Sequence, residues 1–174
     1  MSTRLPERID PLRLANRGTR LAGELPLSAM ERLIAVVHQA TETARVELEF
    51  DLDADGRARI AGRVSTVVQL LCQRCLKPVA WPVERSVGLT AVESPSQADN
   101  LAQDMDPLIC GEAALKLLDI IEDELLLALP QEAKHREGQC AVRHQWSYGD
   151  DDSGELERPR DNPFAVLAQL KDRD

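Results

Sequence analysis

Apolar and polar residues alternate along two runs in the first half of the chain. In residues 46–52 every second side chain is apolar, and the side chains between them are charged. The same alternation returns in residues 58–64, where arginines separate most of the apolar positions. A strand with one buried face has this period of two. Because residues 53–56 between the runs, Asp-Ala-Asp-Gly, favour a turn, the pattern predicts an antiparallel hairpin.

Further strands are indicated on both sides of a short segment that contains two cysteines. Residues 67–71 and 79–92 continue the apolar, strand-like pattern, and a short strand is expected near Leu21. We therefore expect an α+β fold, built on an antiparallel sheet or partly open barrel of about five strands.

Two other stretches place apolar residues at helical spacing. The first, residues 29–40, follows Ser28, with Glu31 three residues later, which is the pattern of a capping box. The second, residues 113–129, ends before Pro130. We expect both helices to pack on the sheet through one apolar stripe. The acidic residues of the second helix are expected on its solvent-facing side: Asp119, Glu122, Asp123 and Glu124.

The remaining segments suggest how the chain is organised around this domain. The divisions are a basic N-terminal arm at 1–20, a single α+β domain at 21–146 with an acidic loop at 93–111, an acidic disordered linker at 147–161, and a C-terminal amphipathic segment at 162–174. The linker combines many charges with few apolar residues, a composition typical of disorder. Asn162 followed by Pro163 favours a short helical start in the last segment.

Charge is distributed unevenly along the 174 residues, whose formal net charge is −9. Residues 1–90 carry 13 Lys and Arg against 11 Asp and Glu, a net of +2, whereas residues 91–174 carry 8 against 19, a net of −11. Phosphate contacts need clustered cations, so the acidic half favours a basic partner such as a ribosomal protein. The same acidic residues would also serve solubility alone. The candidates for RNA contact are Arg13, Arg17 and Arg20, and those for partner binding are Phe164, Leu167 and Leu170.

Several classes of function receive no support from the sequence. No apolar run is long enough to span a bilayer, and the first residues lack the basic-then-apolar pattern of a secretory signal. We therefore expect a cytoplasmic protein without a membrane contact. A glycine-rich phosphate loop, a nucleophile elbow and a Ser-His-Asp ordering are also missing. The chain is therefore not expected to be an enzyme, and no small-molecule substrate is indicated.

Cysteine and histidine residues carry the candidate chemistry. Cys72 and Cys75 have the spacing of one half of a tetrahedral zinc site, on a turn between two strands. His135 and Cys140, just beyond the second helix, have a spacing that supplies the other half. Three thiolates and one imidazole would close the coordination of a structural Zn²⁺ ion. In a cytoplasmic protein a structural disulfide is not expected.

Alternatives to this zinc site remain open. The pair Cys72 and Cys75 also has the spacing of a redox dithiol, and two neighbouring cations would lower a thiol pKa. A strand pattern follows the pair, however, whereas redox dithiols usually precede a helix. His144 is an alternative to His135 as the fourth ligand. Cys110 has no partner at a suitable spacing and is expected to be an ordinary thiol.

Several segments, taken in order, resemble one protein family. CQRCLKP follows a strand, LLDIIEDELLLALP runs into KHREGQC, and NPFAVLAQLK stands near the end. This order and spacing resembles the bacterial YceD family, whose members are called large ribosomal RNA subunit accumulation proteins. The resemblance covers nearly the whole chain and implies a link to 23S ribosomal RNA without an enzymatic activity. Four residues match the family's pattern: Cys72, Cys75, His135 and Cys140.

The resemblance predicts an accessory factor of ribosome biogenesis that supports the synthesis, processing or stability of 23S ribosomal RNA. Its partner would be large-subunit ribosomal RNA or a ribosomal protein. Two alternatives accompany this hypothesis. One is a thiol-redox or zinc-dependent protein that uses Cys72 and Cys75, and the other is an adaptor that binds only a basic ribosomal protein.

Overall fold

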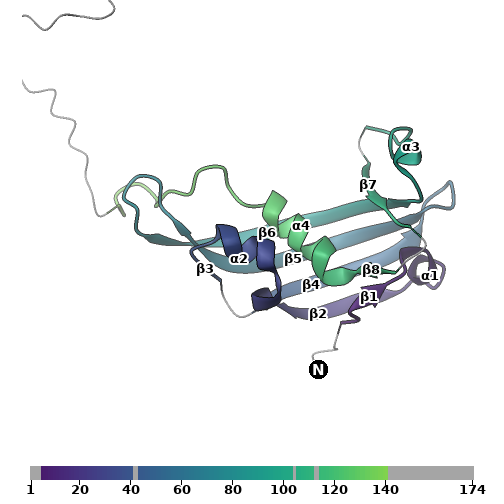
Figure 1. Ribbon diagram of the computed structural model, residues 1–174, viewed down its shortest axis with the longest axis horizontal. Helices are drawn as coiled ribbons and strands as arrows, with labels where there is room; N and C mark the ends of the chain where they lie inside the picture. Colours follow the sequence, from purple (N-terminus) through teal and green to yellow (C-terminus); the bar gives the residue numbers. More distant parts are fainter. Residues whose placement is uncertain (1–4, 41–42, 104, 112–113, 141–174) are drawn as a thin grey trace, which may run out of the picture. The chain divides into compact units, whose positions relative to one another are not determined.

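A computed structural model describes residues 5–40, 43–103, 105–111 and 114–140 (Figure 1). The linker and the amphipathic segment expected at 147–174 lie outside the described residues, and so do Phe164, Leu167, Leu170 and His144. In the part of the chain that the structure describes, none of the helices has the length and apolar character needed to cross a membrane.

A six-stranded sheet forms the centre of the described residues. Five of its strands follow the order β2-β4-β5-β6-β7, and the sixth strand, β3, also pairs with β5. Its strands are β2 (Arg20–Pro26), β3 (Gln39–Ala40), β4 (Thr43–Leu52), β5 (Ala58–Leu71), β6 (Pro78–Val92) and β7 (Asp106–Ile109). All pairs are antiparallel except β6 and β7, which run parallel. The α+β class is confirmed, but the expected all-antiparallel sheet of about five strands is corrected to a mixed sheet.

The parallel pair arises in the segment expected as a loop at 93–111. After β6 the chain passes through a short helix, α3 (Pro95–Ala98), and returns to β7 in the same direction as β6. Parallel neighbours require a crossover of about a dozen residues, and residues 93–105 provide it. Polar composition concealed this strand, because β7 is short and three of its four residues are exposed.

The hairpin predicted from the alternating pattern is confirmed as β4 and β5. Ala44, Val46, Leu48 and Phe50 point into the core, and the charged residues between them face outward. Outward-facing charges pair across the strands: Arg59 contacts Asp51 at 2.6 Å, and Arg63 of β5 contacts Glu84 of β6 at 2.9 Å. The arginines of β5 are therefore matched by carboxylates rather than forming a cationic stripe.

Two helices cover one face of the sheet, α2 (Glu31–Val36) and α4 (Leu117–Leu127) (Figure 1). The expected helix at 29–40 is shorter, because a 3-10 turn, η1 (Leu27–Ala29), precedes α2 and the chain then leaves the helix. The backbone N–H of His38 donates to the carbonyl of Gln69 at 2.8 Å, which draws β3 into the sheet. Sheet pairing thus outweighs the helical pattern, and the predicted cap by Ser28 does not form.

Helix α4 also begins later than expected. Residues Leu115–Lys116 form a short strand, β8, that pairs with β1 (Arg8–Ile9). The outward orientation predicted for its acidic residues is wrong for Glu122 and Glu124, each of which is only 4% exposed. Arg32 pairs with Glu122, and Arg85 pairs with Glu124 at 2.9 Å, which satisfies both buried carboxylates.

The region expected as an N-terminal arm carries structure of its own. Besides β1 it contains α1 (Pro11–Ala15), whose first turn is capped by the side chain of Asp10. Leu5, Ile9 and Ala15 are buried in the hydrophobic core. Residues 5–20 are therefore integrated into the domain.

Candidate metal centre

The turn between β5 and β6 brings two cysteines together. The backbone N–H of Cys72 donates to the carbonyl of Lys77 at 2.9 Å, and the N–H of Leu76 donates to the carbonyl of Cys72 at 2.8 Å. Leu76 has a positive φ of 56° and reverses the chain direction. These bonds fold residues 72–77 into a tight turn, so that Cys75 comes back beside Cys72.

A second loop, the segment that follows α4, supplies the other two residues. The N–H of Gln73 donates to the carbonyl of Ala133 at 2.9 Å, which fastens this loop to the cysteine turn. Ala133 is buried, and two residues later His135 reaches the turn. A further turn, with Gly138 at a positive φ of 79°, leads to Cys140. Two segments about sixty residues apart in the sequence thus meet at one end of the sheet.

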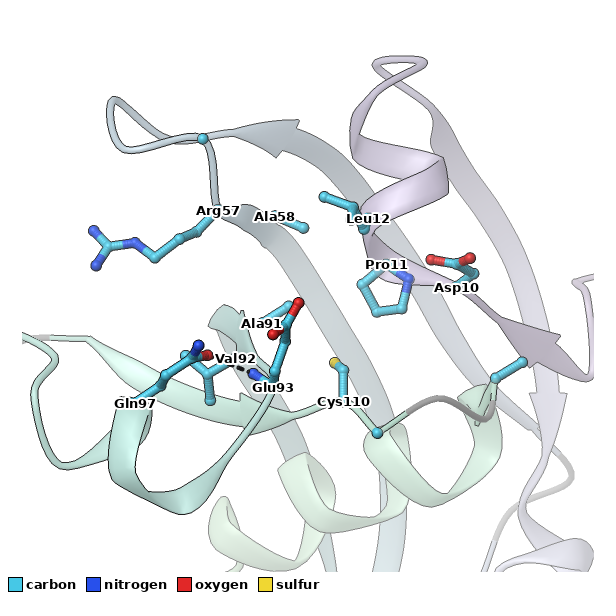
Figure 2. A pocket seen from close by; sticks show the side chains of 13 residues that line it. Asp10, Pro11, Leu12, Arg57, Ala58, Ala91, Val92, Glu93, Gln97 and Cys110 are labelled. Carbon is cyan, nitrogen blue, oxygen red and sulfur yellow. Dashed lines mark hydrogen bonds between the residues drawn. The ribbon is translucent and has the colours of Figure 1, made fainter.

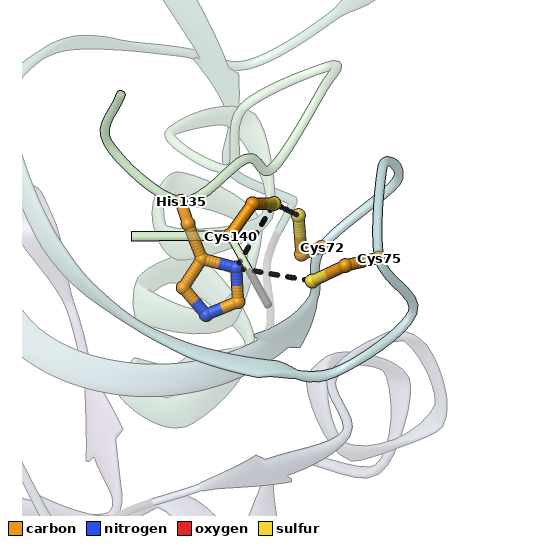
Figure 3. Close-up of side chains that lie close together, drawn as sticks. All are labelled: Cys72, Cys75, His135 and Cys140. Atoms are coloured by element: carbon orange, nitrogen blue, oxygen red, sulfur yellow. Dashed lines mark hydrogen bonds between the residues drawn. The ribbon is translucent and has the colours of Figure 1, made fainter. Parts of the chain in front are cut away.

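The four side chains converge on one point (Figure 3). Their ligand atoms all lie within 4.8 Å of one another. The sulfur atoms of Cys72 and Cys140 are 3.7 Å apart, and His135 Nδ1 lies 3.4 Å from the sulfur of Cys75 and 3.9 Å from that of Cys140. Tetrahedral coordination of zinc places two sulfurs about 3.8 Å apart, and a sulfur and a nitrogen about 3.5 Å apart. The separations therefore fit a tetrahedral ion, and they are far longer than the ~2.0 Å bond of a disulfide.

The orientation of the imidazole also fits a metal ligand. His135 Nε2 lies 3.1 Å from the carbonyl oxygen of Pro78, which can only accept a hydrogen bond. The proton therefore belongs on Nε2, and the lone pair of Nδ1 is directed at the thiols. Metal-bound histidines are held in the required tautomer by an outer hydrogen bond of this kind.

Electrostatics around the cluster favour thiolate at one position. Burial raises the pKa of the Cys72 thiol, but hydrogen bonds from the backbone of His135, Arg74 and Cys75 outweigh it and bring the pKa to about 5. Thiolate is the form that binds metals and attacks disulfides. The pKa of Cys140 is raised by burial, although the guanidinium of Arg74 opposes the shift.

Arg74 is one of the two cations that the sequence places beside the cysteine pair, and in the structure it also contacts the second loop. Its Nε donates to the sulfur of Cys140 at 3.0 Å, and its terminal nitrogen donates to the carbonyl of His135 at 3.3 Å. One cation therefore lies against the sulfur of Cys140 and ties the two loops together. Its position inside the Cys-x-x-Cys turn was the only signal in the sequence.

The structure brings together all four residues predicted as metal ligands, and this group could hold a metal ion. Cys110 lies elsewhere, at the end of β7, as expected from its spacing. Arg13 and Arg17, predicted for RNA contact, are exposed in and just after α1, whereas Arg20 begins β2. Arg20 forms an ion pair with Glu49 at 3.2 Å.

A cavity of about 670 Å³ lies where the first residues of α1 meet the β4–β5 turn and the end of β6 (Figure 2). Several of its polar groups already have structural roles: Asp10 caps α1, Arg57 pairs with Asp53, and the side chain of Gln97 accepts from the N–H of Glu93. Burial raises the pKa of Cys110 at its wall, which keeps this thiol protonated. The cavity is therefore a weaker candidate site than the four-residue cluster. No local sequence pattern predicts this cavity, because it forms only where distant elements meet.

Comparison with known proteins places this α+β domain, with its Cys₃His cluster, in a class linked to ribosomal RNA. Residues 60–171 match the family described as large ribosomal RNA subunit accumulation protein YceD. The chain is also 33% identical, over 171 residues, to the large ribosomal RNA subunit accumulation protein YceD of Haemophilus influenzae, and the match covers 98% of each chain. The chain belongs to the YceD family. No solved structure is significantly similar.

Proposed function

We propose that this chain is a cytoplasmic accessory factor, without enzymatic activity, that supports the synthesis, processing or stability of 23S ribosomal RNA. The observation that carries the proposal is the match to the YceD protein of Haemophilus influenzae. The match extends over 98% of both chains, and the name of that protein refers to large ribosomal RNA subunit accumulation. A match of this extent includes the sheet, α4 and the four residues of the cluster.

Within this proposal, Cys72, Cys75, His135 and Cys140 hold a structural Zn²⁺ ion. Four protein ligands complete a tetrahedral coordination, so a position for a reacting water is not left open. Bound zinc would supply a cross-link between the loop after β5 and the loop after α4. These loops contribute their own support through the hydrogen bond from Gln73 to Ala133 and through the contacts of Arg74.

Contact with the ribosomal particle is proposed at two places. Arg13 and Arg17 are exposed, and within the described residues neither forms an ion pair, which leaves both cations available for phosphate. Arg20 is the weakest of the three candidates, because Glu49 already engages it. The acidic half, with Phe164, Leu167 and Leu170, is proposed to bind a basic ribosomal protein.

Thiol-redox chemistry is the second candidate function, and the lowered pKa of Cys72 favours it. The convergence of His135 and Cys140 on the same point favours the metal site instead, since a dithiol needs neither residue. Metal analysis of the purified protein separates the two. The zinc proposal expects about one Zn²⁺ per chain, lost in Cys72→Ser and retained in Cys110→Ser. A metal-free protein whose Cys72 and Cys75 cycle with thioredoxin or glutathione would instead support the redox function.

The cellular test compares the ratio of 23S to 16S ribosomal RNA in cells with and without the gene. We expect a selective fall in 23S RNA and in free large subunits after deletion, with recovery when the wild-type gene or the Cys110→Ser variant is supplied. The variant Arg13→Ala/Arg17→Ala should restore less 23S RNA if these arginines contact RNA, whereas an adaptor that touches only protein predicts full recovery. A ratio unchanged by deletion under several growth conditions would refute the proposed function.

A further inference from the structure

Strand β2 lies at the outer edge of the sheet (Figure 1). Among the described residues its pairing partner is β4 alone, so the opposite side of the strand carries backbone groups that the sheet does not use. An unpaired strand edge is a template for another strand. The opposite edge of the sheet is a less suitable template, because β7 has only four residues and includes Pro107.

The hydrogen-bonding pattern identifies which groups of β2 face outward. Phe50 donates its N–H to the carbonyl of Thr19 at 2.9 Å, so Thr19 and every second residue after it point their backbone groups toward β4. The N–H of Asp53 donates to the carbonyl of Arg57. The residues of β4 that bond to β5 therefore alternate with those that bond to β2. The N–H and C=O groups of Arg20, Ala22 and Glu24 consequently face away from the sheet.

These three residues form a self-complementary sequence. In an antiparallel pair of two β2 strands centred on Ala22, Arg20 of each copy lies opposite Glu24 of the other copy, and the two Ala22 residues face each other. Opposite charges at directly opposed positions stabilise a strand pair. In this register, the residues that lie opposite each other are also those whose N–H and C=O groups point outward. The pairing therefore permits about six backbone hydrogen bonds.

The side chains on this edge permit a close approach. Arg20, Ala22 and Glu24 are all exposed on the face of the sheet opposite the helices, and Ala22 between the charges is small. The side chain of Arg20 is 77% exposed, although it pairs with Glu49 of its own chain. Edges that avoid association usually carry charges that repel a second copy, whereas the order Arg-x-Ala-x-Glu attracts one.

We infer that β2 is the interface of a symmetric homodimer, in which two β2 strands pair antiparallel about Ala22 and join the two sheets into one. Such an interface uses the same surface on both subunits, as a two-fold axis requires. The inference concerns assembly. It goes beyond the proposed role in 23S RNA accumulation and does not depend on it.

Sedimentation of the purified full-length chain tests the inference. Wild type is expected as a dimer at micromolar concentrations, with twice the 19.3 kDa mass of the chain. Arg20→Glu sets a carboxylate opposite Glu24 of the other copy and should weaken dimerisation at least tenfold. Combining it with Glu24→Arg should restore the dimer. Ala22→Pro removes an outward N–H without removing a bond to β4, and it should also give monomers.

A matched control keeps the result interpretable. Arg63→Glu makes the same charge change on the same face of the sheet but in β5, away from the edge, and should leave the dimer intact. Circular dichroism and thermal midpoints establish that each variant is folded, because Arg20→Glu also breaks the pair with Glu49. A monomeric wild type, or a dimer that persists in folded Arg20→Glu and Ala22→Pro variants, would overturn the inference.

Discussion

The two ends of the long β5–β6 ladder are held together by different forces. Where β4 and α4 cover it, the ladder contributes fully buried side chains such as Ile60 and Val64, which pack with Phe50 and Ile121. Past Leu71 the buried apolar residues almost cease, and the next turn exposes Leu76 at 74%. At this end the four residues of the cluster, and not a hydrophobic core, bring the two loops together.

This difference shows how a small domain extends a hairpin beyond its core. Burial of apolar area stabilises the covered part in proportion to that area, but the two loops at the far end bury little beyond Cys72 and Ala133. A small structure without enough core usually needs a cross-link. The comparison therefore predicts that damage to the covered part acts on the whole domain, whereas damage to the cluster stays local.

The largest effect is expected from Gly62→Ala, in the covered part. A methyl group at Gly62 would lie 2.0 Å from the carbonyl oxygen of Glu47 on β4, so the strands would have to separate. We expect a loss of about 3 kcal/mol or more in the free energy of unfolding, measured by urea denaturation. Gly88→Ala is the control, since a methyl group there meets nothing within 4 Å and should change stability by less than about 1 kcal/mol. Equal effects at the two positions would contradict the close approach.

Cys72→Ser should act at the other end. We expect loss of bound metal, together with the stabilisation that metal provides, about 2.7 kcal/mol when free metal is at a hundred times its dissociation constant. Hydrogen exchange should accelerate in residues 72–77 and 133–140 and stay slow in β4. Uniform acceleration through the sheet would show that the cluster supports the whole domain and would remove the contrast between the two ends.

Glu122→Ala probes how a helix is fastened to the covered part. The carboxylate of Glu122 accepts from the backbone N–H groups of Arg32 at 2.7 Å and Leu33 at 3.0 Å, and it therefore caps α2 from another helix. Losing these charge-assisted bonds should cost about 2 kcal/mol, measured by thermal or urea denaturation. Asp123→Asn is the matched control, because Asp123 contacts the same arginine from an exposed position and should cost less than about 0.5 kcal/mol.

The smallest effect is expected at the β4–β5 turn and depends on pH. Burial raises the pKa of Asp53, but hydrogen bonds from the backbone and side chain of Arg57 outweigh it, so the pKa is lowered on folding. A lowered carboxyl pKa contributes stability that is present above the unfolded pKa of about 3.9 and is lost as pH falls through the folded value. Asp53→Asn should therefore cost less than about 1 kcal/mol at pH 7, and the difference from wild type should shrink toward pH 3. A constant difference between pH 7 and pH 3 would count against this account.

Local patterns in the sequence predicted those elements whose formation depends on residues close together in the chain. Alternation between residues 46 and 52 was sufficient for β4, because one face of that strand is buried along its length. Cysteine and histidine spacing predicted the two pairs of the cluster, with His144 left open as an alternative to His135, since tight turns set the geometry within each pair. The parallel strand β7 has only four residues, and its place depends on a partner that no local pattern identifies.

Long-range ion pairs explain the errors about the helices. Glu122 and Glu124 look like a solvated helix surface in the sequence, but Arg32 and Arg85 reach them from α2 and β6. Burial of a carboxylate is tolerable only with such partners, and those partners are 90 and 39 residues away along the chain. The same contact from Glu122 replaces the cap that Ser28 was expected to provide.

The separation of the four cluster residues along the chain has a consequence for the order of folding. Cys72 and Cys75 meet through a turn of a few residues, whereas His135 and Cys140 must wait until α4 has docked, because loop closure across some sixty residues is slow and entropically costly. During synthesis the second pair also leaves the ribosome after the first. Complete coordination would therefore mark chains that have finished folding, and a half-formed site would leave Cys72 and Cys75 without the second pair in chains that have not.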